Sequence, residues 1–292
     1  MQIPNVGFSY ESTEQAEFEI IDMAKIYRSK GYDHDPAAPH RVSFFMMIFI
    51  EEGEGVHMVD FKEYPFKPGT MLFVQRDQVH AFDDTSQPKG KILIFTQAFL
   101  DNLHTNMRLP NYTPTHLNRQ HSPFLQLEGE SRERTHNLIL QITQELDLND
   151  RDPLIVMYLF SALALILKRQ QPDEHCESLS QSQSATFSRF FTLLQSNFQR
   201  VRDANWYASQ IGTTYKTLNQ VCKLAAGLTA KQVIDNFTIL EIKRRLVVSN
   251  ITSQQIAFDF GFEDASNFVK YFKKETQLTP SQFQKLYVTP AL

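Results

Sequence analysis

The stretch from Gly261 to Pro280 constrains the fold of this 292-residue chain more than any other part of the sequence. Thr252 or Ser253 can cap a helix that runs to Gly261, where a residue that tolerates positive φ suits a sharp turn. Asp264 can cap the helix that follows. The pattern therefore predicts two short helices joined by a tight turn, over about residues 253–276.

The second of these helices has two different faces. Phe268 and Phe272 are four residues apart and point to the same side, toward a core. The opposite side is polar and basic. Asn and Gln can pair with adenine edges, and Lys can reach guanine or phosphate. The candidate DNA-contacting residues here are Ala265, Ser266, Asn267, Lys270, Lys273 and Lys274.

An earlier segment, about residues 203–226, repeats this arrangement less regularly. A helix runs from Asp203 to Ile211, Gly212 provides the turn, and Thr214 can cap the next helix. Leu218 and Val221 point inward. The candidate DNA-contacting residues on the outer face are Thr214, Tyr215, Lys216, Thr217, Asn219, Gln220 and Lys223. We call this segment the first motif and residues 253–276 the second motif.

Charge separates the two parts of the chain. From Phe187 onward thirteen Lys/Arg stand against seven Asp/Glu, although the whole chain carries a net charge of −4. A basic segment beside an acidic one predicts that only the former meets a polyanion. A basic outer face on a single helix is more often a solvated surface, but two such faces, each after a glycine turn, favour binding to double-stranded DNA. Two such helices, placed about one helical turn of DNA apart, would enter successive major grooves.

Residues 42–97 alternate short β-rich runs with turn signals, which predicts an antiparallel barrel or sandwich. Helical periodicity then predicts helices over 132–148 and 153–169, whose apolar stripes either form a dimer surface or pack under the barrel. The apolar run 154–167 is shorter than the roughly twenty residues of a membrane span, so no membrane partner is expected.

The segment 171–186, rich in Ser, Gln and acidic residues, is interpreted as a linker between domains 1–170 and 187–292. No signal peptide is visible after Met1, and only two cysteines occur. Both observations indicate a reducing, cytoplasmic location.

These residues carry a resemblance. Residues 187–287 resemble the DNA-binding domain of the AraC/XylS family of bacterial transcription regulators. The match rests on Ile256-Ala257, Gly261-Phe262, Asp264, Ser266, Phe268, Phe272-Lys273-Lys274 and Thr279-Pro280. The resemblance implies two helix-turn-helix units joined by a linker helix, activation rather than repression, and RNA polymerase as a partner. Three positions depart from the family pattern: Cys222 replaces a usual Phe, Gln277 a usual Gly, and Gln284 a common Arg.

The amino-terminal part is similar to the cupin-like ligand-binding domain of the same family, on Gly53 to Phe61, Tyr64, Pro68-Gly69 and Gln78 to Phe82. This similarity implies a β-barrel that binds a small effector, followed by helices that dimerise. The expected fold is thus two-domain α+β: a cupin-like β-barrel with flanking helices, then an all-α double helix-turn-helix domain.

An apolar or aromatic acid, or a fatty acid, suits the composition of this domain better than a sugar. The candidate lining residues are Phe45, Met47, Phe49, Phe73 and Phe82, and the candidate polar contacts are His40, Arg41, Arg76 and His80. Metal-dependent cupin enzymes need a His-x-His motif, which the sequence lacks, so neither catalysis nor a cofactor is expected. Control by a protein partner remains an alternative to control by a small molecule.

Overall fold

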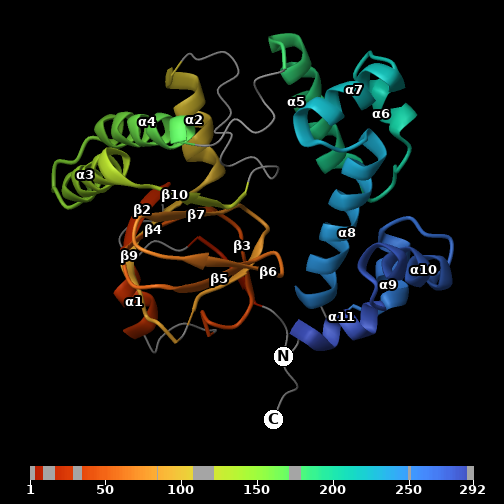
Figure 1. Ribbon diagram of the computed structural model, residues 1–292, viewed down its shortest axis with the longest axis horizontal. Helices are drawn as coiled ribbons and strands as arrows, with labels where there is room; N and C mark the ends of the chain where they lie inside the picture. The colour runs from red at the N-terminus through yellow and green to blue at the C-terminus, as the bar shows by residue number, and fades with distance from the viewer. Residues whose placement is uncertain are drawn as a thin grey trace. The chain divides into compact units, whose positions relative to one another are not determined.

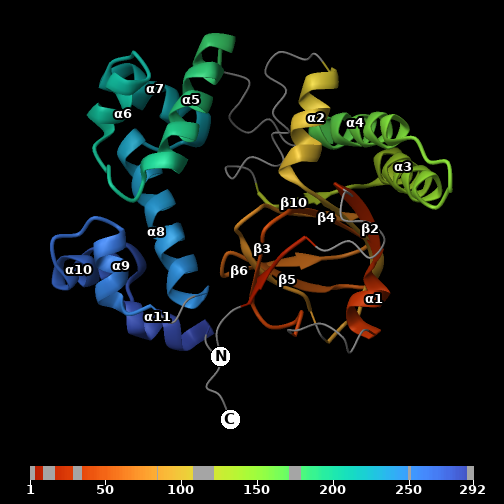
Figure 2. The same cartoon turned by 180° about the vertical axis from the view of Figure 1, so that it is seen from behind.

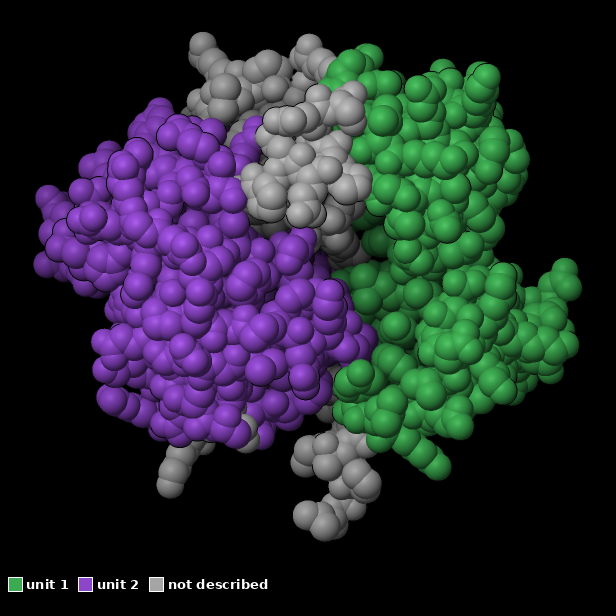
Figure 3. All heavy atoms as spheres, viewed as in Figure 1, with its two compact units in different colours: residues 1–3, 172–292 green, residues 4–171 purple. Residues whose placement is uncertain are grey.

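The computed structural model describes residues 4–8, 17–28, 35–83, 85–107, 122–170, 179–248 and 251–287. The chain divides into two compact units (Figure 3). We call residues 4–171 the β unit and residues 172–292 the helical unit.

The β unit contains two five-stranded sheets. The strands of the first sheet, in spatial order, are β1 (Asn5–Val6), β3 (His40–Val42), β8 (Val79–Ala81), β5 (Gly55–Val59) and β6 (Lys62–Phe66). Those of the second are β10 (Phe124–Gln126), β7 (Thr70–Val74), β4 (Phe45–Glu52), β9 (Lys89–Phe95) and β2 (Phe18–Asp22). Among the described pairs only β1–β3 is parallel, so the predicted antiparallel β architecture is confirmed.

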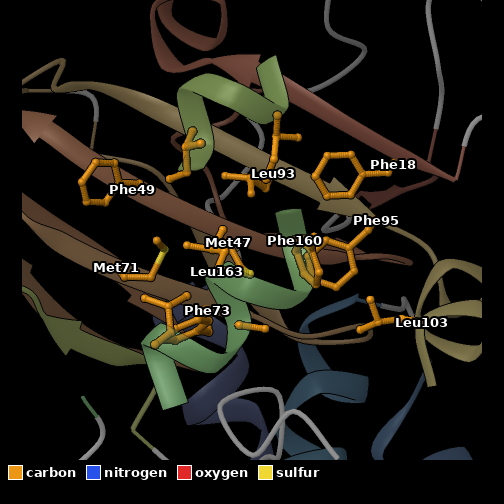
Figure 4. Packing of buried hydrophobic residues seen from close by; sticks show 14 of the residues in the cluster. Phe18, Met47, Phe49, Met71, Phe73, Leu93, Phe95, Leu103, Phe160 and Leu163 are labelled. Atoms are coloured by element: carbon orange, nitrogen blue, oxygen red, sulfur yellow. The ribbon is translucent and has the colours of Figure 1, made fainter. Parts of the chain in front are cut away.

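Both faces of the second sheet are buried, and successive residues of β4 alternate between them. Met46 and Ile48 belong to the core between the two sheets, together with Val59 of β5. Met47 and Phe49 belong to a separate core between the sheet and the helices (Figure 4). Since side chains on a strand alternate in direction, this continuous apolar run is the signature of a strand covered on both sides.

The helices of the β unit are α1 (Met23–Arg28), α2 (Gln97–Met107), α3 (Gly129–Leu146) and α4 (Pro153–Gln170). α3 and α4 lie side by side in both ribbon views (Figures 1 and 2). Phe160 and Leu163 of α4 are fully buried in the same core as Phe95 and Leu93 of the sheet, and the Phe160 ring packs on Phe95 (Figure 4). The apolar stripe of α4 therefore packs on the sheet, which was one of the two predicted roles.

α4 is longer than the apolar run that predicted it. Its 18 residues meet the length and composition of a membrane-crossing helix, the one such helix within the described ranges. Eight of its residues are buried in the β unit, including Val156, Phe160 and Leu167. This burial is typical of the core helix of a globular domain.

α4 also has exposed large apolar side chains at helical spacing, and the neighbouring α3 has one, Leu140. These side chains are between 41 and 59% exposed, and they are Leu140, Leu154, Ile155, Tyr158 and Leu165. We call these five residues the α3–α4 surface.

The helical unit contains α5 (Gln181–Asn197), α6 (Ala204–Gln210), α7 (Tyr215–Ala226), α8 (Ala230–Val248), α9 (Ser253–Asp259), α10 (Ala265–Thr276) and α11 (Pro280–Tyr287). The prediction of linker over 171–186 is wrong at its carboxyl end, because α5 begins at Gln181. Ser180 and Gln183 form a capping box there, with the Ser180 hydroxyl accepting from the Gln183 amide at 3.2 Å. Residues 171–178 lie outside the described residues.

Candidate nucleic-acid interface and effector site

The first motif is built by α6, a glycine turn and α7. Gly212 has φ +73°, a conformation that a side chain disfavours. The Thr214 hydroxyl then accepts from the Thr217 amide at 3.1 Å and so caps α7. Leu218 and Val221 are buried, as their spacing predicts. The turn and the cap together fix where the outer face of α7 begins.

Cys222, at the position where the resemblance implies Phe, is fully buried in the core of the first motif. Burial raises the pKa of its thiol to about 12, so the group stays protonated at neutral pH. This cysteine therefore acts as a small apolar side chain.

The second motif repeats the construction with α9 and α10. Gly261 has φ +68°, and the Asp264 carboxylate accepts from the Asn267 amide at 2.7 Å to cap α10. Phe268 and Phe272 are fully buried. Gln277 ends α10 with φ +63°, in the left-handed region, which explains in physical terms why glycine is usual at this position.

The structure places most of the predicted DNA-contacting residues on exposed surface. On the first motif the exposed ones are Thr214, Tyr215, Lys216, Thr217, Gln220 and Lys223. On the second they are Ser266, Asn267, Lys270, Lys273 and Lys274, while Ala265 is half-buried. Each motif thus has an outer face of hydroxyl, amide and ammonium groups above an apolar core.

Two predicted contacts are engaged within the protein. The Asn219 side-chain oxygen accepts from the Ala230 amide at 2.9 Å, so the half-buried Asn219 holds the first turn of α8. The Asn267 side-chain amide donates to the Asp264 carboxylate at 3.0 Å. Asn219 therefore has a structural role that helical spacing alone did not indicate.

Four predicted lining residues of the effector site lie in a different layer. Phe45, Met47 and Phe73 lie on the face of the second sheet that packs against the helices. Phe49 shares this face, whereas the inter-sheet core is formed by the residues between them, such as Met46 and Ile48. The prediction treated the four as the lining of a barrel, and it missed their direction because β4 is apolar on both faces.

A cluster of histidines occupies the inter-sheet face of the first sheet. His40, His57 and His80 come from β3, β5 and β8 and are at most 3% exposed. His80 Nδ1 lies 3.3 Å from His57 Nε2, and the His40 and His80 rings are 4.1 Å apart. Phe82 packs beside them, 5.1 Å from the His57 ring. His40 and His80 were predicted as a polar contact set, whereas His57 was not.

The environment of the histidines keeps His57 neutral. Burial and, to a smaller extent, nearby His40 lower its pKa to about 3, while Asp83 opposes the shift. Neutral imidazoles can donate or accept a hydrogen bond inside a core. No group of three or more His, Cys, Asp or Glu suited to a metal ion occurs among the residues described.

The two predicted arginines are engaged outside this cluster. Arg41 donates to the Asp77 carboxylate at 2.7 Å, and Arg76 Nε lies 3.7 Å from the same side chain. Arg41 follows His40 on the strand and so points to the other face of the sheet. A separate cleft of about 590 Å³, which the sequence did not indicate, opens beside α1. Its charged lining residues are Asp22, Lys25, Arg28, Glu51 and Lys89.

Comparison with known proteins agrees with this two-part organisation. Residues 24–151 match the family of the AraC-like ligand binding domain, and residues 207–286 match a helix-turn-helix domain. The chain belongs to the AraC family of transcription regulators. The match to the ligand-binding domain lies within the β unit, and the helix-turn-helix match runs from Tyr207 on α6 to Leu286 on α11.

Individual relatives are distant. The transcriptional activator RhaR of Salmonella schwarzengrund is 23% identical over 92% of this chain and 95% of its own length. ToxT from Vibrio cholerae is 14% identical, with a TM-score of 0.47 over 94% of this chain and 100% of that structure. Another ToxT structure, with an unsaturated fatty acid bound, has a TM-score of 0.46 over 94% of this chain and 97% of that structure, at 14% identity.

Proposed function

We propose that this AraC-family chain is an effector-responsive transcription activator that binds two adjacent major grooves on one face of DNA. One observation carries the proposal: two capped helices, α7 and α10, each present an exposed face with lysines above a buried core. Activation is proposed because RhaR relatives are named as activators. RNA polymerase as a partner, a cytoplasmic location and the absence of catalysis are proposed from family membership.

The exposed residues divide into two proposed roles. Lys216, Lys223, Lys270, Lys273 and Lys274 neutralise phosphates and release counterions, which gives affinity without sequence preference. Gln220, Ser266 and Asn267 are proposed to meet base edges, where amides pair bidentately with adenine. The bond from Asn267 to Asp264 supports this role, because it holds the amide in one orientation.

Binding measurements with selected DNA test the proposal. Duplexes selected from a random pool by the wild-type protein supply the site. Lys273→Ala should weaken all sequences similarly and reduce the salt slope by about 0.9, whereas Asn267→Ala should relax selectivity at one base pair by about 1–3 kcal/mol. Lys285→Ala removes an exposed lysine of α11 outside both faces and serves as the control. Selection without enrichment of any sequence contradicts the proposal.

For the effector we propose an apolar or aromatic acid held in the β unit, with its carboxylate near the histidine cluster. The support is chemical: three buried imidazoles and Phe82 share one face, so polar and apolar partners lie together. Thermal unfolding with decanoate or benzoate tests this, with decanol and benzyl alcohol as neutral controls of similar shape. The acids alone should raise the melting temperature, by mass action. An equal effect of the alcohols, or no effect of either acid, would refute it and favour control by a protein partner.

We further propose that the α3–α4 surface joins two copies of the chain. Exposed apolar side chains grouped on one surface are unusual in monomers and mark interaction sites. Sedimentation velocity should show a dimer for the wild type and a monomer for Tyr158→Glu. Gln87→Glu, at an exposed loop position, should remain dimeric. A monomeric wild type at micromolar concentration contradicts this part of the proposal.

A further inference from the structure

The segment between α5 and α6 lies against the turn of the second motif, 58 residues away in sequence. Arg202 donates a hydrogen bond from Nη2 to the Phe260 carbonyl, the last residue before the glycine turn. Its guanidinium carbon also lies 3.8 Å from the centroid of the Phe262 ring. A planar cation stacked at this distance has both an electrostatic and a packing attraction to the ring. Arg202 therefore contacts the residues on both sides of Gly261, Phe260 and Phe262.

The backbone of the same segment approaches the turn closely. A Cβ on Gly261 would lie 3.0 Å from the Gln199 carbonyl oxygen, which is tighter than nine in ten real Cβ contacts. Phe198 places its ring 5.8 Å from Phe260 and 5.2 Å from Phe237 of α8. Gly261 thus serves two purposes: it forms the turn with φ +68°, and it leaves room for the neighbouring chain.

The contact continues into the recognition helix itself. The Arg202 guanidinium lies 5.6 Å from the ring of Tyr271 on α10, which packs 5.3 Å from Phe262. The Tyr271 hydroxyl donates to the Asp235 carboxylate of α8 at 3.3 Å. Burial is the largest cause that lowers the pKa of Arg202, with Tyr271 and Asp235 opposing it, which is typical of a cation held in a packed seam. Three parts of the helical unit therefore meet at this site: the segment before α6, helix α8 and helix α10.

We propose that Arg202 is a positioning residue that locks the two motifs into one rigid reader, so that the protein accepts two half-sites at one fixed separation. This inference rests on the proposed DNA binding. Figure 1 shows why a lock is needed: α8 runs as a single helix between the α6–α7 pair and the α9–α10 pair. A single helical connection leaves rotation of the second pair restrained only by its side contacts, and Arg202 connects the segment before α6 to both the turn and α10.

Rigid connection has a measurable consequence for binding. When one motif is bound to DNA, the other motif is held at a high effective concentration near its own groove. This holds only if the two half-sites have the matching spacing. Each base pair inserted between the half-sites rotates the second one by roughly 35°, because a turn of DNA holds 10–10.5 base pairs. If the two motifs are held rigidly, the protein should bind such a site poorly. If they can move relative to each other, the protein should tolerate the altered spacing but bind its preferred site less tightly.

The test uses the full-length protein and the duplex selected by the wild type, with one or two base pairs inserted or deleted between the half-sites. Arg202→Gln removes the stack and the charge. Arg200→Gln is the matched control, because Arg200 is an exposed arginine of the same segment. The wild type and Arg200→Gln should lose at least about tenfold in affinity for each altered spacing. Arg202→Gln should bind the original spacing about tenfold more weakly and discriminate between spacings by only about threefold.

Arg202→Lys keeps the positive charge but loses the planar stack, so it should also lose the spacing preference, which lost attraction to phosphate alone would not cause. If Arg202→Gln unfolds, as judged by circular dichroism, Arg202→Lys decides. Retention of the wild-type spacing preference in the folded Arg202 variants, or its loss in Arg200→Gln, would overturn the inference. Failure of the wild type to select any two-part site would instead refute the proposed DNA binding itself.

Discussion

Replacement of Phe160 by alanine tests how the β unit is held together. The Phe160 side chain is fully buried on α4, and its ring centroid lies 5.0 Å from Phe95, 5.2 Å from Phe99 and 5.5 Å from Phe18. Phe→Ala in a packed core removes 3–5 kcal/mol of stability, through lost transfer energy and the remaining cavity. With three aromatic neighbours, we expect about 4 kcal/mol for Phe160→Ala.

Urea unfolding converts this energy into a shift that is easy to measure. A slope of about 2 kcal/mol per molar, ordinary for a domain of this size, predicts that the midpoint of the β unit falls by about 2 M. Near-ultraviolet circular dichroism follows its many buried Phe side chains. Trp206, the single tryptophan, lies on α6 of the helical unit, and its fluorescence transition should not move.

Arg169→Ala is the matched control on the same helix, because this side chain is exposed and lies outside the α3–α4 surface. Surface substitutions usually change stability by no more than about 0.5 kcal/mol, so its midpoint should hardly change. Equal shifts for the two variants, or a Phe160→Ala shift below about 0.5 M, would refute the packing of α4 on the sheet.

Three further predictions concern local features. Asp264→Ala removes the cap of α10 and should cost about 1 kcal/mol in thermal unfolding of the helical unit, most of which Asp264→Ser restores. Gly261→Ala should cost at least about 1 kcal/mol, from its positive φ and the approach of Gln199, and an unchanged melting temperature would contradict the described contact. His57 has a pKa of about 3 when folded against 6.5 when unfolded, so the unfolded chain takes up the proton first as the pH falls. Stability should therefore drop by about 2 kcal/mol between pH 7 and pH 5, and His57→Phe should remove this part of the pH dependence.

The sequence predicted the two motifs well because their signals are local. Caps such as Thr214 and Asp264, glycine turns, and phenylalanines four residues apart are all read within one or two turns of helix. The inward placement of Phe268 and Phe272 is confirmed for this reason. The predicted end of the linker at residue 186 was wrong, because α5 begins at Gln181. A capping box is hard to recognise in a segment that contains many Ser and Gln residues.

The features that sequence did not predict depend on distant parts of the chain. Strand β4 is apolar at every position from Phe45 to Ile50, so its two faces could not be told apart, and Met47 was assigned to a lining that it does not join. Asn219 has the same appearance as a base-reading amide, but it caps a helix eleven residues later. Arg202 is one arginine among many in the sequence, and only the folded chain brings it to the second motif.

Hydroxyl-radical footprinting of the wild-type protein on its selected duplex tests the central claim most directly, namely that α7 and α10 enter successive major grooves. The two motifs should protect two patches on one face of the DNA, centred about 10–10.5 base pairs apart. A single protected patch, or two patches on opposite faces of the duplex, would contradict the account.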